Sequence, residues 1–175
     1  IIRDSFISGN RARSTAGSGG SGAGGGLFVA DAVVSVADTT LSGNLASASG
    51  GGIYNRGTVW LTNSVVKENA IDDEGDRGNG GGVFNGGVML IRDATVGANS
   101  AGTFGGGIFN TGNLVLEGAT VARNEVLAQM QSCAPERGPC NGGGGIWNAG
   151  CSVRVRCRPR SSICVCRSIQ GATCS

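Results

Sequence analysis

The stretch Gly50-Gly-Gly-Ile-Tyr-Asn-Arg-Gly-Thr-Val-Trp-Leu-Thr-Asn-Ser-Val-Val-Lys-Glu-Asn69 decides the fold, because the chain repeats it. Residues 80–99 and 105–124 match it without a gap, and residues 24–44 match it with one extra residue. Residues 1–10 match only its second half and residues 143–156 only its first half, so we expect the chain to begin inside a repeat. Self-similarity at a period of about 20–50 residues is typical of solenoids and related repeat folds.

Apolar residues occupy the same positions in each copy and alternate with a period of two. The Leu61 column, for example, also holds Ile2, Val36, Ile91 and Leu116. This spacing is that of a β-strand and not of a helix, and β-branched residues dominate the columns. The pattern predicts three short strands per coil, over residues 51–55, 58–62 and 64–67, and an all-β parallel β-solenoid of about five to six coils.

Asparagine fills two further columns, which we expect to form side-chain ladders at the corners of the coil. The first holds Asn10, Asn44, Asn69, Asn99 and Asn124, and the second holds Asn55, Asn85, Asn110 and Asn148, with Val29 as its exception.

Insertions of unequal length leave the coil at one corner, after the Asn69 column. Variable loops on one edge of a repeat protein are where binding function usually lies. We expect a repeat domain over residues 1–156. Residues 157–175 form a tail rich in Arg and Cys, which is a terminal cap, a basic arm or a stretch read out of frame.

Charge argues against nucleic-acid binding by the repeat domain. The chain has a net charge of +2, but residues 151–175 contain five Arg and no acidic residue. Residues 1–150 are therefore left with nine basic and twelve acidic residues, a net charge of about −3. No apolar run is long enough to span a membrane.

The repeat resembles those of bacterial right-handed, single-stranded parallel β-helix proteins of the pectin-lyase-like superfamily. It is most similar to the Gly-Gly-Gly-Ile-Tyr-Asn repeats of large secreted or surface-anchored bacterial proteins. It is also similar to the passengers of polymorphic outer-membrane proteins, although their Phe-x-x-Asn motif is missing. The resemblance implies a right-handed coil, an extracellular or cell-surface location, and a structural or adhesive role beside further coils of the same helix. It also implies an alternative role, as a polysaccharide lyase or hydrolase.

An aromatic column is the first candidate binding surface. Strand alternation places its members on the outer face, where stacked rings could bind sugar rings or a protein partner on a host or cell surface, or pack on one another. The column holds Phe28, Tyr54, Phe84, Phe109 and Trp147.

Two acidic groups are candidates for metal binding or catalysis. Residues 71–79 gather Asp72, Asp73, Glu74 and Asp76 around a glycine, and this loop is either a Ca²⁺ site or a solvated acidic loop. A corner column holds Asp4, Asp38, Asn63 and Asp93 and is interrupted by Gly118. This column is the nearest approach to the acidic cluster of a lyase, with Arg92 beside Asp93 as a candidate partner, but turn capping explains the column without a function and is favoured.

Cysteine and histidine usage limits the chemistry further. Cys133 and Cys140 flank the segment Ala-Pro-Glu-Arg-Gly-Pro within the longest insertion, and we expect a local disulfide there in an oxidising compartment. The chain has no His, and no nucleophile–base pair can be assigned, so a structural or adhesive role is favoured over an enzyme or a non-catalytic glycan-binding module.

Overall fold

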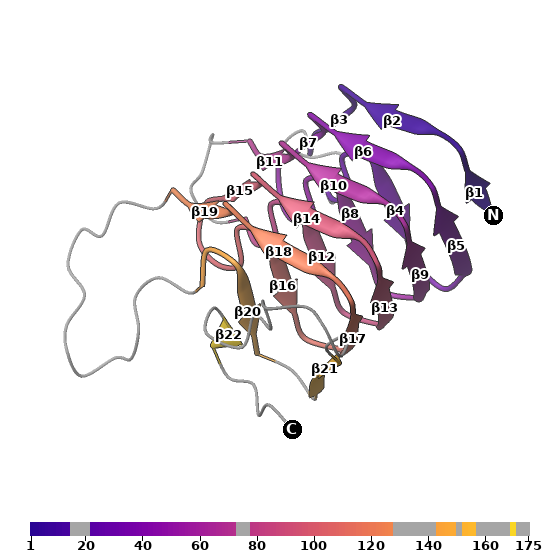
Figure 1. Cartoon of the computed structure of the whole chain (residues 1–175). Helices are drawn as coiled ribbons and strands as arrows, with labels where there is room; N and C mark the ends of the chain where they lie inside the picture. Colours follow the sequence, from indigo (N-terminus) through magenta and orange to yellow (C-terminus); the bar gives the residue numbers. More distant parts are fainter. Residues whose placement is uncertain (15–21, 73–77, 128–142, 150–151, 157–168, 171–175) are drawn as a thin grey trace.

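The computed structural model describes residues 1–14, 22–72, 78–127, 143–149, 152–156 and 169–170. These residues wind into an all-β parallel solenoid, as the repeat predicts, with no helix among them. Each strand pairs in parallel with the equivalent strand of a neighbouring coil, so the strands stack into four sheets (Figure 1). Between them lie a large apolar cluster and a smaller one. We call these sheets A to D, in the order in which the chain first enters them.

All 22 strands of the described residues belong to these sheets. Sheet A contains β1 (Ile2–Arg3), β5 (Val33–Ala37), β9 (Thr58–Thr62), β13 (Val88–Arg92), β17 (Asn113–Glu117) and β21 (Ser152–Arg156). Sheet B contains β2 (Phe6–Ser8), β6 (Thr40–Ser42), β10 (Val65–Lys67), β14 (Thr95–Gly97) and β18 (Thr120–Ala122). Sheet C contains β3 (Arg11–Ala12), β7 (Leu45–Ala46), β11 (Ala70–Ile71), β15 (Ser100–Ala101) and β19 (Glu125–Val126). Sheet D contains β4 (Leu27–Val29), β8 (Ile53–Asn55), β12 (Val83–Asn85), β16 (Ile108–Asn110), β20 (Ile146–Asn148) and β22 (Ile169–Gln170).

The coil has four sides, and the prediction of three was wrong in this respect. The fourth side is sheet C, whose two-residue strands lie at the start of the segments that we interpreted as insertions. These strands bury a small apolar cluster of Ala46, Ile71 and Ala101. The variable loops therefore leave the coil after sheet C and not directly after the Asn69 column.

The stack contains about four turns, slightly fewer than the five to six expected. The terminal strands β1 and β22 have only two residues each and bound incomplete coils. At the C-terminal end, β21 pairs in register with β17, so that Val153 and Val155 continue the columns of Leu114 and Leu116. Of the tail after residue 156, the structure describes only β22, which pairs with β20.

The apolar columns fill the interior from coil to coil. In sheet B the register joins Leu41 to Val66, Val66 to Val96, and Val96 to Val121. The first three of these side chains are fully buried, and Val121 is 6% exposed. Since each coil alone contributes only a few such side chains, its core is completed by the coils on either side.

The first asparagine column forms the predicted ladder at the corner between sheets B and C. The Oδ1 of Asn99 accepts hydrogen bonds from the backbone N–H and from Nδ2 of Asn69, both at 3.0 Å. The same Nδ2 donates to the carbonyl oxygen of Leu41 in the preceding coil, at 3.1 Å. Asn44 and Asn99 repeat this arrangement, and both Asn69 and Asn99 are fully buried. The prediction of buried, satisfied corner residues is confirmed.

The second asparagine column forms a ladder along sheet D. Asn55 donates through Nδ2 to Asn85, Asn85 to Asn110, and Asn110 to Asn148, at 2.7–2.8 Å. Val29 occupies the next position toward the N-terminus and is 2% exposed. The Oδ1 of Asn55 is consequently buried without a hydrogen-bond partner in the described part of the chain.

We expect Val29→Asn to extend the second ladder at little cost. The new Nδ2 would face the unpaired Oδ1 of Asn55, and satisfying a buried acceptor offsets the loss of about 1.5–3 kcal/mol of apolar burial. The free energy of unfolding, measured in urea, should change by less than about 1 kcal/mol. Val36→Asn, in the same coil but without an asparagine partner, should cost about 3 kcal/mol or more. Equal losses for the two variants would show that the ladder does not accept a new member.

Candidate functional site

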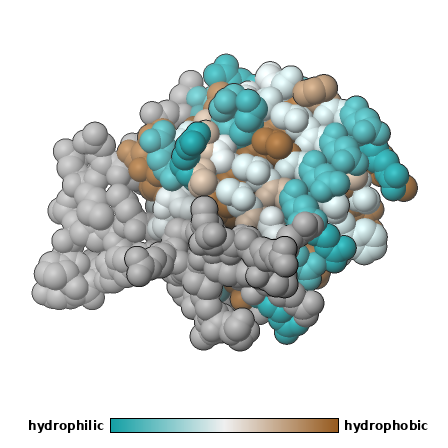
Figure 2. All heavy atoms as spheres, viewed as in Figure 1, coloured by the Kyte–Doolittle hydropathy of each residue, from teal (hydrophilic) through white to brown (hydrophobic). Residues whose placement is uncertain are grey.

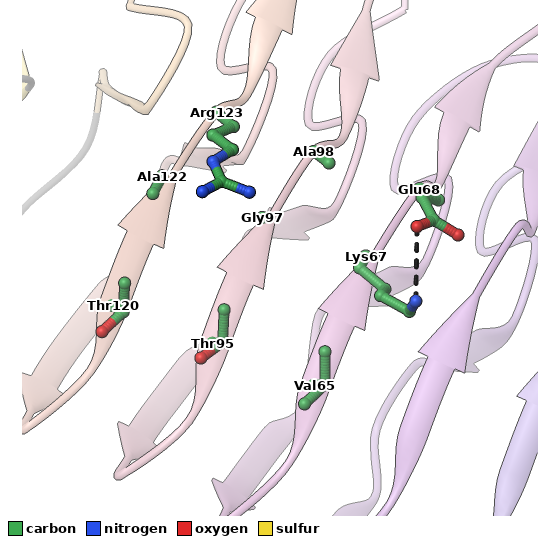
Figure 3. Close-up of a pocket in the computed structure, with 9 residues that line it drawn as sticks. All are labelled: Val65, Lys67, Glu68, Thr95, Gly97, Ala98, Thr120, Ala122 and Arg123. Atoms are coloured by element: carbon green, nitrogen blue, oxygen red, sulfur yellow. Dashed lines mark hydrogen bonds and ion pairs between the residues drawn. The ribbon is translucent and has the colours of Figure 1, made fainter.

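The outer face of sheet B carries a shallow groove of about 460 Å³. We call it the sheet B groove. It is lined by Val65, Lys67, Glu68, Thr95, Gly97, Ala98, Thr120, Ala122 and Arg123, from three successive coils (Figure 3). Pale and brown side chains cover the middle of this face in Figure 2, and hydrophilic side chains follow its margins. The groove is thus an open, mostly uncharged depression between polar edges.

Departures from the repeat produce this depression. Lys67, Gly97 and Ala122 are aligned by the register of sheet B, and the corner positions that follow them hold Glu68, Ala98 and Arg123. In the middle coil both positions are small, so the surface between β10 and β18 is hollow. Sequence reasoning missed this site, and its only signal was the pair of small residues Gly97 and Ala98, where the preceding copy carries Lys67 and Glu68.

The charges around the groove are not balanced. Lys67 Nζ lies 3.3 Å from the Glu68 carboxylate, so these two residues neutralise each other. Within the described ranges, none of the ion pairs involves Arg123, which is exposed. Its guanidinium reaches from the end of β18 toward Gly97 on β14 (Figure 3). The groove therefore has one uncompensated positive charge at its rim.

The aromatic column forms a stacked ladder on sheet D. Ring centroids are 5.1 Å apart for Phe28 and Tyr54, 4.7 Å for Tyr54 and Phe84, and 5.4 Å for Phe84 and Phe109. Beyond Phe109, the loop residue Phe104 extends the ladder to Trp147, with a centroid distance of 4.8 Å. The ring faces are used mainly on one another, because each ring packs against its neighbours. Sugar or protein binding by this column stays a prediction.

Exposure along the aromatic ladder is uneven. Phe28, at its N-terminal end, is 48% exposed, whereas Phe109 is only 9% exposed. Phe28 is thus the member most accessible to a partner.

The acidic corner column is explained by backbone conformation. Asp4, Asp38, Asn63 and Asp93 have φ between 47° and 51°, and Gly118 has φ 61°. Asp, Asn and Gly are the residues that tolerate this left-handed region, so the turn itself selects them. Arg92 does not need Asp93 as its partner, because its guanidinium lies 2.8 Å from the Glu117 carboxylate of the next coil.

Of the acidic loop, only Asp72 lies within the described residues. Its Oδ2 is 3.6 Å from Arg11 Nε and 3.4 Å from Arg13 Nη2, so this carboxylate is already paired with two cations. Asp73, Glu74 and Asp76 lie outside the described residues, as do Cys133 and Cys140. The described residues contain no group of three or more His, Cys, Asp or Glu side chains arranged to hold a metal ion. The proposed Ca²⁺ site and the disulfide both stay predictions.

No helix in the described part of the structure is long and apolar enough to cross a membrane. No protein-family model, curated protein or solved structure gives a significant match to this chain.

Proposed function

We propose that this chain is a structural and adhesive stretch of a secreted or surface-anchored bacterial protein. We further propose that its coil belongs with the right-handed repeats of the pectin-lyase-like superfamily, on the basis of the Gly-Gly-Gly-Ile-Tyr-Asn motif. The structural role is supported by one observation: the side chains that recur in each repeat make contacts between coils. Asn69 and Asn99, for example, direct all of their side-chain hydrogen bonds to neighbouring coils.

A rod built in this way is well suited to present a surface. Its core and both ladders stabilise the stack, while the outward positions of the sheets are free to vary without loss of register. The outer face of sheet B shows such variation, since one column there passes from Lys67 to Gly97 and Ala122. Adhesion through an outer face fits an extracellular or cell-surface location.

The proposal is tested by separating adhesion from catalysis. The purified chain, coupled to beads, is scored for retention on cultured host cells and for release of unsaturated products from pectate and alginate. We expect retention above that of beads carrying a denatured sample, and no product. Retention no higher than for the denatured chain would contradict the adhesive role. Product formation that is lost in Arg92→Ala or Asp93→Asn would instead identify a polysaccharide lyase.

A further inference from the structure

We propose that the sheet B groove is a docking site for an acidic segment of a partner protein, with Arg123 binding a carboxylate of that segment. The inference rests on the proposed adhesive function, because it names the partner class and the surface that would be used. It is carried by the uncompensated charge of Arg123, the small residues beneath it and the chemistry of the groove walls.

The charge at the rim selects an anionic partner. Lys67 is paired with Glu68 at 3.3 Å, whereas Arg123 takes part in none of the ion pairs within the described part of the chain. A guanidinium presents two parallel N–H donors, which match the two oxygens of a carboxylate. A carboxylate placed over Gly97 would therefore lie beside the guanidinium of Arg123, which forms none of the ion pairs among the described residues.

The backbone at the rim is strained in order to carry these side chains. The corner after each sheet B strand requires positive φ, and in the first two coils glycine supplies it, at Gly9 and Gly43. The next three coils have Glu68, Ala98 and Arg123 there, with φ of 54–57°. Residues with a Cβ adopt this region at a cost in free energy, and such strain is often found where a side chain has a function. Ala98 shares this conformation with only a methyl group, so the strain does not by itself single out Arg123, but it does mean that glycine would satisfy the turn at Arg123 at lower cost.

The groove walls favour a peptide over a glycan. The lining residues include Val65, Ala98 and Ala122 but no aromatic ring on which a sugar could stack. Small apolar surfaces beside a cation suit the methyl groups and the carboxylate of a peptide segment. The backbone of β14 is already paired with β10 and β18, so the segment would be held by side chains and not added as a further strand.

The experiment is a titration of the ¹⁵N-labelled chain, followed by NMR. The probe is the peptide acetyl-Ala-Glu-Ala-Ala-amide, and its Gln analogue is the uncharged control. We expect the Glu peptide to shift the amide signals of Gly97, Ala98 and Ala122, and the shifts to weaken as salt is added. The Gln analogue should bind about tenfold more weakly or not at all.

Two variants remove the site without endangering the fold. Arg123→Gly supplies the residue that the corner prefers, so it should fold at least as well as the natural chain while reducing the affinity about tenfold. Ala122→Leu should fill the groove from an exposed position and block binding. Arg56→Gln, which removes an exposed charge at another corner, is the matched control and should bind normally.

The results distinguish this inference from the function on which it rests. Absence of groove shifts with the Glu peptide, or unchanged binding by Arg123→Gly, would overturn the docking site even if the beads still adhered to cells. Groove shifts produced by oligogalacturonate but not by the Glu peptide would replace the peptide with an acidic glycan. Loss of adhesion together with normal peptide binding would instead contradict the adhesive function.

Discussion

Replacing Gly51 with alanine is expected to lower the free energy of unfolding by about 3 kcal/mol or more. The added Cβ would press against the carbonyl oxygens of Ala70 and Gly81, which are backbone atoms of this coil and the next. Neither oxygen can withdraw without opening the stack, because both belong to segments that are hydrogen-bonded between coils. Urea unfolding followed by circular dichroism measures the effect.

Gly97→Ala is the control for this prediction. A Cβ at Gly97 would lie 3.2 Å from the Ala122 carbonyl oxygen and 3.6 Å from Thr95 Cγ2, on the outer face of sheet B. We expect a loss below about 1 kcal/mol there, because small outward adjustments relieve the contact. If Gly51→Ala were no more destabilising than Gly97→Ala, the close approach of neighbouring coils at Gly51 would be refuted.

Replacing Asn99 with alanine should lower the free energy of unfolding by about 1–3 kcal/mol, because hydrogen bonds of the ladder are lost. The substitution leaves the buried N–H of Asn69 without its acceptor and removes the donor to the Val66 carbonyl oxygen. Asn10→Ala removes the terminal member of the same column, which is exposed and bonded only to Asn44 among its ladder neighbours. Urea titrations of both variants should show a loss below about 0.5 kcal/mol for Asn10→Ala. A loss below about 0.3 kcal/mol for Asn99→Ala would contradict a stabilising ladder.

Sequence reasoning was most successful for the columns, in which each residue stacks on the equivalent residue of the next coil. The apolar columns and both asparagine columns could be predicted because stacking places like residues next to one another, and the register of β9, β13 and β17 follows the alignment of the repeats. The break in the second ladder was also visible, as Val29 in an asparagine column.

The features that sequence reasoning missed depend on backbone geometry that the period-two pattern of apolar residues does not predict. Sheet C was overlooked because strands of two residues, such as Ala70–Ile71, are too short to show a period. Glu and Arg do not by themselves indicate positive φ, so this conformation at Glu68 and Arg123 could not be predicted from their residue types. Gly9 and Gly43, at the equivalent position in the first two coils, do indicate it. The sheet B groove arises where Gly97 and Ala98 replace longer side chains. In a repeat whose outward positions vary, such a replacement cannot be told from neutral sequence variation.

The central claim is that successive coils stack in parallel register, and NMR measures this most directly. In a methyl-labelled sample, nuclear Overhauser contacts between register partners report the stacking. We predict contacts from Leu41 to Val66, from Val66 to Val96, and from Val96 to Val121, all between residues 25–30 positions apart. Contacts confined to residues within one repeat, or shifted by one position between repeats, would contradict the solenoid described here.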